Sequence, residues 1–401
     1  MYKKYLLIGG FAILQFIAKA QGRVDSIAQK VKHTQIEAVY GHYLQDGENS
    51  AVTGGIGTEE LTVFSPSVKI NHTTGAHSFL IKGGTDVITS ASTDNINAVL
   101  STASLKDSRI YSQLQYENTS SEKVQSVYVG TGFSFESDYL SFNFLGGFSK
   151  SNTEKGRSGS LEIQYFQDDL RWGRLSRGFF SPVKLVYPLE LRYKDWHDEY
   201  LRRSYNIRGA YTQVLNKRNV IGVFPDFTWQ KGLLATPFHR VYFNDGTLRV
   251  EELPDSRAKV SLGLRLNTFV GGRLILKNSI NPYWDNFGIS GMSLENEIII
   301  KLRPNLNVSS YLRGYLQEGS DYFKPYRLHD PGQEFYTSDY DLADLKSFSV
   351  GTGLKYYPDN KPDRFTNYES VSFKYMYMIQ SNGLSAHIMS CVIQLSMDHS
   401  K

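Results

Sequence analysis

The sequence predicts an all-β fold, a transmembrane antiparallel β-barrel of about 16 strands, with roughly 14 to 18 as the expected range. Segments in which apolar and polar residues alternate recur along most of the chain, and 13% of its residues are aromatic. Only 40% of the residues are hydrophobic. A helical membrane bundle needs repeated apolar runs of about 20 residues, so this class of membrane protein is excluded.

Residues 1–20 have the pattern of a secretory signal peptide. Lys3 and Lys4 form a positive start, residues 5–17 are apolar, and the tripeptide ending at Ala20 matches the small-x-small cleavage pattern. We expect cleavage after Ala20, which leaves residues 21–401 as the mature barrel domain. An exported chain with this strand pattern is expected in the outer membrane, in contact with its lipids.

The alternation is clearest in the neighbouring segments 123–135 and 138–149. Val129 stands on the apolar parity of the first segment, and Phe142 and Phe144 on that of the second. A soluble β-sandwich also alternates, but its strands are usually about five or six residues long, whereas these are roughly twice as long. In a membrane barrel the apolar parity faces lipid. That face is therefore expected to include Val129, Phe142, Phe144, Leu264, Ile300, Phe373 and Ile393.

The same pattern predicts a strand in each of seventeen segments. An even number is expected of such a barrel, so one of these predictions must be wrong, and the first three segments are the weakest. The segments are 34–44, 59–71, 76–84, 107–117, 123–135, 138–149, 158–167, 184–193, 203–215, 218–230, 257–269, 272–282, 291–302, 306–318, 345–357, 368–380 and 384–397.

The connections between these strands differ in length. Long connections are expected near 233–256 and 319–343, and residues 86–107, which are small, polar and without period, are expected to form a long loop or a partial plug. If both chain ends lie in the periplasm, the short turns are periplasmic and the long loops face outward. The short turns are expected at 136–138, 216–219, 271–272 and 303–305.

Several segments together resemble an uncharacterised outer-membrane β-barrel family, defined as a domain of unknown function. The resemblance covers nearly the whole mature chain. The resemblance implies that the gene lies beside genes for a small lipoprotein, a thioredoxin-like protein and a periplasmic flavin transferase. The family has no catalytic motif that could be carried over to this chain. The segments that carry it are AVTGGIGTE (51–59), GGTD (83–86), QVLNKR (213–218), TPFHRVYF (236–243), LPDSR (253–257) and TSDYDL (337–342).

Other residues are weighed as sites and set aside. Ser385 and His387 could be parts of a lipase-type site, but the Asn-Gly pair before them favours a hairpin turn. The histidines at 33, 42, 72 and 77 match no zinc spacing, and the glycines at 54–57 read as a flexible turn at the rim. Asp339, Asp341 and Asp344 lack the glycine and closing Glu of an EF-hand. We expect no catalytic residue, no metal ligand and no cofactor.

The segment 236–257 could be a recognition loop, but a folded outer cap is the favoured interpretation. It combines Arg240, Arg249 and Arg257 with Phe238, Tyr242 and Phe243.

Charge gives a prediction about the barrel interior. The whole chain has 44 basic and 40 acidic residues, too even a balance for a dedicated nucleic-acid binder, and the single Cys391 excludes a disulfide scaffold. On four consecutive predicted strands, however, cations gather on the inward parity, opposed there by Glu295 and Glu297. This basic wall consists of Lys259, Arg265, Arg273, Lys277, Lys301 and Arg313.

A basic wall beside water raises the local concentration of anions, although the two glutamates could instead pair with Arg265 and Arg313 and brace the wall. The expected function is a non-enzymatic pore, an exporter, or a docking partner for a small lipoprotein or a flavin-linked periplasmic protein. An outer-membrane lipase or protease and a sealed structural or adhesive barrel are the alternatives.

Overall fold

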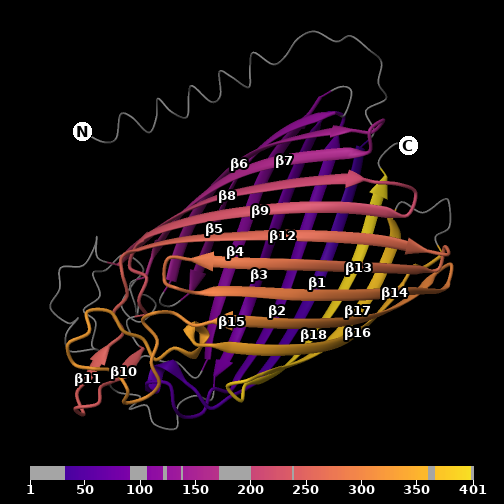
Figure 1. Ribbon diagram of the computed structural model, residues 1–401. Coiled ribbons are helices and arrows are strands. Elements are labelled where there is room, and N and C mark those ends of the chain that lie inside the picture. Colours follow the sequence, from indigo (N-terminus) through magenta and orange to yellow (C-terminus); the bar gives the residue numbers. More distant parts are fainter. Residues whose placement is uncertain are drawn as a thin grey trace, which may run out of the picture.

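The computed structural model describes residues 32–90, 106–120, 124–136, 139–170, 200–236, 239–359 and 366–398. Sixteen strands form a closed barrel in the order β1-β18-β17-β16-β15-β14-β13-β12-β9-β8-β7-β6-β5-β4-β3-β2 (Figure 1). A separate two-stranded sheet, β10–β11, lies beyond one end of the barrel. The predicted antiparallel barrel and its expected number of about 16 strands are confirmed. Among the described residues, none of the helices is both long enough and apolar enough to cross a membrane.

Each barrel strand is 12 to 15 residues long. The strands are β1 (Lys32–Asp46), β2 (Leu61–Thr74), β3 (His77–Ser90), β4 (Lys106–Thr119), β5 (Gln125–Glu136), β6 (Tyr139–Asn152), β7 (Arg157–Asp169), β8 (Leu201–Val214), β9 (Asn219–Gly232), β12 (Ser256–Val270), β13 (Leu274–Asp285), β14 (Ser290–Arg303), β15 (Leu306–Glu318), β16 (Leu345–Tyr356), β17 (Thr366–Gln380) and β18 (Ser385–Asp398). The short elements are η1 (Ala51–Thr53), β10 (Arg240–Tyr242), β11 (Leu248–Val250) and η3 (Tyr340–Leu342).

The barrel closes between its first and last strands. β1 pairs antiparallel with β18 over its length, with Ile36 opposite Leu395. No sheet edge is left open in the barrel, so the backbone groups of the strands bond to one another. This is the condition for a sheet to span lipid.

Sixteen of the seventeen predicted segments form barrel strands. The remaining segment lies outside the residues that the structure describes. The first three segments, which seemed weakest, are β1, β2 and β3. The strand predicted at 184–193 lies outside the described residues, and β7 pairs directly with β8. The predicted signal peptide and its cleavage site after Ala20 also lie outside them.

Both ends of the segment 86–107, which was expected to form a long loop or a partial plug, belong to strands. β3 continues to Ser90 and β4 begins at Lys106, and Asp86 lies opposite Arg109 within the sheet. Residues 86–90 and 106–107 are therefore strand, because polar residues also fit a strand whose inward side is polar. Residues 91–105 lie outside the described residues.

The long connections 47–60, 233–255 and 319–344 lie at one end of the barrel, here called the loop end, and both described chain ends lie at the other, the terminal end (Figure 1). The predicted turns near 216–219, 271–272 and 303–305 are at the terminal end, as expected. The turn at 136–138 is not, since β5 ends and β6 begins at the loop end. Turn length alone therefore did not identify the side of the membrane for this connection.

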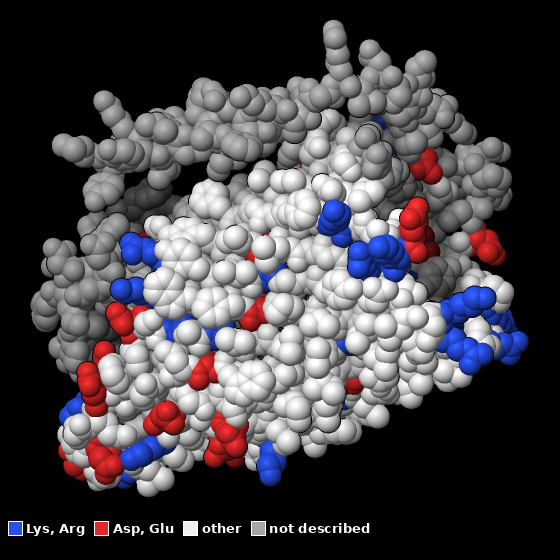
Figure 2. All heavy atoms as spheres, turned by 45° about the horizontal axis from the view of Figure 1, so that its top comes forward, with Lys and Arg blue, Asp and Glu red and all other residues white. Residues whose placement is uncertain are grey.

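The two faces of the barrel wall differ as the alternation predicts. Phe144 and Ile300 retain 60% and 45% of their surface on the outside, while Ser349 on the opposite parity retains 1%. All seven residues predicted for the lipid face are exposed large hydrophobics. Figure 2 shows mostly uncharged side chains across the middle of one face, with charged side chains gathered toward its ends. An apolar belt around a closed sheet is the outer surface of a transmembrane barrel.

Candidate functional site

The predicted basic wall is formed by β12 to β15, with one exception. Lys259 and Arg265 alternate with outward Leu264 on β12, and Lys277 and Arg313 lie on the same inward parity of β13 and β15. Lys301 is inward on β14, near the terminal end. Arg273 belongs to the turn before β13 and is exposed at the terminal end, so it is not part of the inward face.

The glutamates of this wall form ion pairs. Lys277 Nζ lies 2.9 Å from Glu297 Oε2, and Lys374 Nζ of β17 lies 3.4 Å from Glu297 Oε1. Arg313 Nε lies 3.3 Å from Glu295 Oε1. The bracing alternative is therefore correct for Arg313 but wrong for Arg265.

Within the described part of the chain, three inward cations of the wall, Lys259, Arg265 and Lys301, form no ion pair. Arg265 stacks over the Phe224 ring, with 5.0 Å between the guanidinium carbon and the ring centroid. Within the described part of the chain, neither Arg265 nor Lys259 has a carboxylate oxygen within the 4.0 Å of an ion pair. The wall thus keeps positive charge that its acids do not neutralise.

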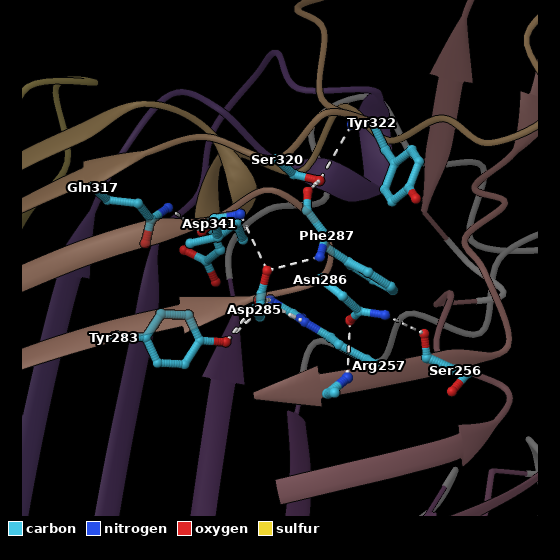
Figure 3. A network of polar contacts seen from close by, with 12 residues as sticks. Ser256, Arg257, Tyr283, Asp285, Asn286, Phe287, Gln317, Ser320, Tyr322 and Asp341 are labelled. Carbon is cyan, nitrogen blue, oxygen red and sulfur yellow. Dashed lines mark hydrogen bonds and ion pairs between the residues drawn. The ribbon is translucent and has the colours of Figure 1, made fainter. Parts of the chain in front are cut away.

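A third carboxylate on this wall was missed by the sequence interpretation, because the strand predicted at 272–282 extends to Asp285. Asp285 Oδ2 accepts hydrogen bonds from Arg257 Nε at 2.9 Å and from the Tyr283 hydroxyl at 2.7 Å. Its Oδ1 accepts from the backbone N–H of Phe287 at 2.9 Å (Figure 3). Asp285 therefore closes the turn between β13 and β14 and holds Arg257 at the loop end.

Another part of the lumen wall contains an ion-pair ladder. On β7 to β9, Arg208 lies 3.0 Å from Asp226 and 3.5 Å from Glu162, and Arg202 lies 2.9 Å from Asp168. Cations and carboxylates are more nearly matched here than on β12 to β15. The lumen therefore has unlike walls.

Water has access to parts of this interior. The inward side chains of Lys374 and Arg208 keep 62% and 49% of their surface exposed, although both take part in ion pairs. Smaller inward residues are covered by their neighbours. Tyr128 lies over Gly147, where an added Cβ would come within 2.2 Å of the Tyr128 ring.

The loop end bears a folded cap, defined as residues 233–255 and 319–344. β10 pairs with β11, and isolated bridges join Phe243 to His329 and Glu252 to Tyr336. Val241 and Phe243, both fully buried, pack with Tyr336. Residues 236 and 239–255 of the predicted segment 236–257 are therefore part of a folded cap, whereas Ser256 and Arg257 belong to β12, and residues 237–238 lie outside the described part.

The loop between β1 and β2 packs against the cap. Gly54 and Gly55 each have a φ of +85°. A Cβ at Gly54 would lie 2.6 Å from the Tyr242 ring, and one at Gly55 would lie 2.7 Å from the Ser338 carbonyl oxygen. The turn predicted as flexible is therefore closely packed, because glycine lets two backbones approach and adopts positive φ.

Hydrogen bonds also tie the cap to the barrel rim. Ser320 Oγ donates to the Phe287 carbonyl over 2.9 Å, and Gln317 Nε2 donates to the Asp341 carbonyl over 3.0 Å (Figure 3). Ser320 and Asp341 lie in the cap, whereas Phe287 lies in the turn between β13 and β14 and Gln317 in β15.

The structure also places the residues that the sequence analysis considered as catalytic or metal sites and did not favour. Ser385 and His387 share the outward parity of β18, where His387 bonds to the Tyr375 hydroxyl at 2.8 Å, and the turn before them is confirmed. The four N-terminal histidines spread over β1, β2 and β3 and make separate contacts, such as that of His33 with Asp398. Asp344 accepts from the Gly319 N–H.

A grouping that sequence reasoning missed is that of His239, Glu251 and Asp339 in the cap. His239 and Glu251 stand in one segment with a mixed composition, but Asp339 comes from the other cap segment. No spacing rule connects them, since the contact depends on the folding of the cap. Among the described residues, these three side chains are the one group of His, Cys, Asp or Glu whose ligand atoms lie close enough together to hold a metal ion.

Comparison with known families gives one match that covers most of the chain. The chain belongs to the DUF3570 family. The family model, described as a protein of unknown function, matches residues 4–363. This agrees with the resemblance to a barrel family defined as a domain of unknown function. Among curated proteins, none matches the DUF3570 chain.

Solved structures align with most of this chain at low identity and low TM-score. A BenF-like porin from Pseudomonas fluorescens Pf-5 has a TM-score of 0.42 and 9% identity, over 91% of this chain and 98% of the porin. The outer membrane protein OpdK from Pseudomonas aeruginosa has a TM-score of 0.42 and 8% identity, over 92% and 98%. A deletion mutant of the TodX monoaromatic hydrocarbon channel has a TM-score of 0.43 and 8% identity, over 92% and 91%.

Proposed function

We propose that this DUF3570 chain is a non-enzymatic outer-membrane barrel that forms a water-filled pore with a preference for anions. The apolar belt around sixteen closed strands supports a membrane location. The signal-peptide pattern of residues 1–20 supports export to the outer membrane.

The observation that carries the pore is the exposure of inward charges. Lys374 and Arg208 point into the lumen and keep 62% and 49% of their side-chain surface exposed. A charged side chain in a dry, filled interior would be covered and fully paired. Barrels of about sixteen strands are also wide enough to leave an aqueous channel.

The anion preference rests on Lys259 and Arg265. Both lie on the inward parity of β12 without a carboxylate in ion-pair range among the described residues. Fixed charge of one sign along a water-filled cleft raises the concentration of the opposite ion there. The paired residues Lys277, Arg313 and Lys374 contribute less, because their carboxylate partners offset their charge.

Planar bilayer recordings test this function. The purified barrel should give discrete conductance steps, and in a salt gradient the reversal potential should have the sign of anion preference. A folded barrel that never conducts would support the sealed structural or adhesive alternative. Hydrolysis of lipids or peptides that is lost on replacing Ser385 or His387 would support the enzyme.

A second role follows from the family resemblance and the charge at the terminal end. Lys301 and Arg273 lie at that mouth, which would face the periplasm. They could receive an anionic segment of a small lipoprotein or a flavin-linked partner. Co-purification from native membranes, lost when both residues become Glu, would support docking.

A further inference from the structure

The cap brings three possible metal ligands together from two distant loops. His239 Nδ1 lies 3.6 Å from Glu251 Oε1 and 3.7 Å from Asp339 Oδ2. One ligand atom from each of the three residues lies within 4.8 Å of the others. Glu251 is nearly buried, with 3% of its side chain exposed, and Asp339 keeps 25% exposed.

The two carboxylates are held in place by the cap backbone and by Thr337. The N–H of Thr236 donates to Glu251 Oε2 over 2.6 Å, and the buried Thr337 hydroxyl donates to Glu251 Oε1. Asp339 Oδ1 accepts from the Asp341 N–H over 3.0 Å, which leaves Oδ2 directed at His239. Ligands oriented by hydrogen bonds of this kind are characteristic of metal centres.

The separations suit a small divalent ion. Zinc binds imidazole nitrogen and carboxylate oxygen at about 2.0–2.2 Å in tetrahedral sites, which places neighbouring ligand atoms roughly 3.4 Å apart. The two distances from His239 are close to this value without any rearrangement of the loops. One imidazole with two carboxylates suits zinc and similar transition ions better than calcium, which prefers oxygen ligands alone.

The surroundings carry an excess of negative charge. Glu59, from the loop between β1 and β2, and Asp341 stand near the same group. Burial and repulsion from Asp341 and Asp339 raise the pKa of Glu59 to about 7. A single imidazolium cannot balance the carboxylates of Glu251, Asp339 and Asp341, whereas a divalent ion neutralises two of them.

We propose that His239, Glu251 and Asp339 form a site for Zn²⁺ or a similar divalent transition ion, with a water molecule as the fourth ligand. The ion would join the segment after β9 to the segment after β15 and fix the cap over the loop end of the barrel. The alternative is a structural ion pair between protonated His239 and the two carboxylates. This site does not depend on whether the lumen conducts.

Zinc binding to the full-length folded barrel in detergent tests the proposal directly. The chelator-stripped protein is titrated with Zn²⁺ against a chromogenic competitor, and with Co²⁺ to record the absorption bands of tetrahedral coordination. We expect one equivalent to bind. His239→Ala and Asp339→Asn should each weaken binding at least about 100-fold, and Thr337→Val, which removes the hydroxyl that donates to Glu251 and accepts from the Asp339 N–H, about 10–100-fold.

Asp330→Asn is the matched control, because Asp330 is a cap carboxylate that contacts Lys324 and Asn244 instead of His239. It should bind zinc as the unmodified protein does. Heat-modifiability on gels shows for every variant that the barrel is folded. No binding by the unmodified folded protein, or equal binding by all variants, would overturn the proposal and leave the ion pair as the role of these residues.

Discussion

Arg257 and Asp285 form a buried ion pair where the barrel wall meets the cap. Arg257 Nε donates to Asp285 Oδ2 over 2.9 Å, and the Asp285 side chain has no exposed surface. The Arg257 guanidinium also lies over the Phe287 ring, with 4.6 Å to its centroid. Because Phe287 accepts a hydrogen bond from Ser320 of the cap, this pair links β12 and β13 to the cap.

Replacement of Asp285 should therefore loosen the cap. Asp285→Ala leaves the Arg257 charge without its partner, and breaking a buried pair in this way costs about 3–5 kcal/mol. We expect protease cleavage within 319–344 at much lower protease concentration, while the barrel itself stays heat-modifiable. Asp330→Ala, at an exposed pair with Lys324, should cost about 0–1 kcal/mol. Equal resistance of the two variants to protease would contradict this role of Asp285.

The two parities of one strand give a matched test of the membrane face. Leu114 is outward and 50% exposed near the middle of β4, and Gln113 beside it is inward. Leu114→Arg should destabilise the barrel by about 2–4 kcal/mol, since it places a charge in lipid, whereas Gln113→Arg should be nearly neutral. Urea unfolding in lipid vesicles measures both. Equal tolerance would show that the register is wrong.

Acidity should tighten the cap in the absence of metal. The pKa of Glu59 is raised to about 7 by burial and by Asp341 and Asp339, so the folded cap binds a proton more tightly than the unfolded chain does. The contribution of Glu59 to the stability of the folded cap is therefore fully present below its ordinary pKa of about 4.5. This contribution is lost as pH rises through about 7. Although burial opposes it, the carboxylates of Glu251 and Asp339 also raise the pKa of His239, which acts in the same direction.

Protease resistance of the cap, measured in chelator from pH 5 to pH 8, should fall as pH rises. Glu59→Gln keeps a neutral side chain at that position and should flatten the part of the profile near pH 7. The surrounding groups, Gln45, His239 and Asp341, are retained in this variant. A profile that rises with pH, or one unchanged by the substitution, would argue against the assigned direction.

The barrel could be predicted from the sequence because the strands follow a rule with period two. Val129 and Phe144 showed which parity faces outward, and the structure places both on the outer surface. Ends of strands were less certain, since polar residues such as Asp86 and Asp285 fit the inward side of a strand as well as they fit a loop. Because of this ambiguity, two strands were predicted too short, and Asp285 was not recognised as the carboxylate that pairs with Arg257.

The cap cluster could not be predicted, because its residues meet only through tertiary folding. His239 and Asp339 are distant in sequence and neither lies on a periodic segment. The basic wall could be predicted as a set of positions but not as a set of ion pairs. Whether Glu297 binds Lys277 or Arg265 depends on the register between β13 and β14, which places Lys277 opposite Glu297.

Arg265→Glu should reduce the anion preference of the pore. Arg265 is inward and contacts the Phe224 ring instead of a carboxylate, so the substitution reverses a charge that has no local balance. Lys155→Glu, in the exposed turn between β6 and β7, makes the same charge change outside the lumen wall and should leave the preference nearly unchanged. Identical reversal potentials for the two variants would show that Arg265 does not face the path of the ions.

The reversal potential of the unmodified barrel in a salt gradient tests the central claim most directly. Protein shown to be folded by heat-modifiability is inserted into a planar bilayer with unequal KCl on the two sides. The unneutralised Lys259 and Arg265 predict stepwise conductance and a reversal potential displaced toward that of chloride. A folded barrel that inserts without conducting, or one whose reversal potential is displaced toward that of potassium, would contradict an anion-preferring pore.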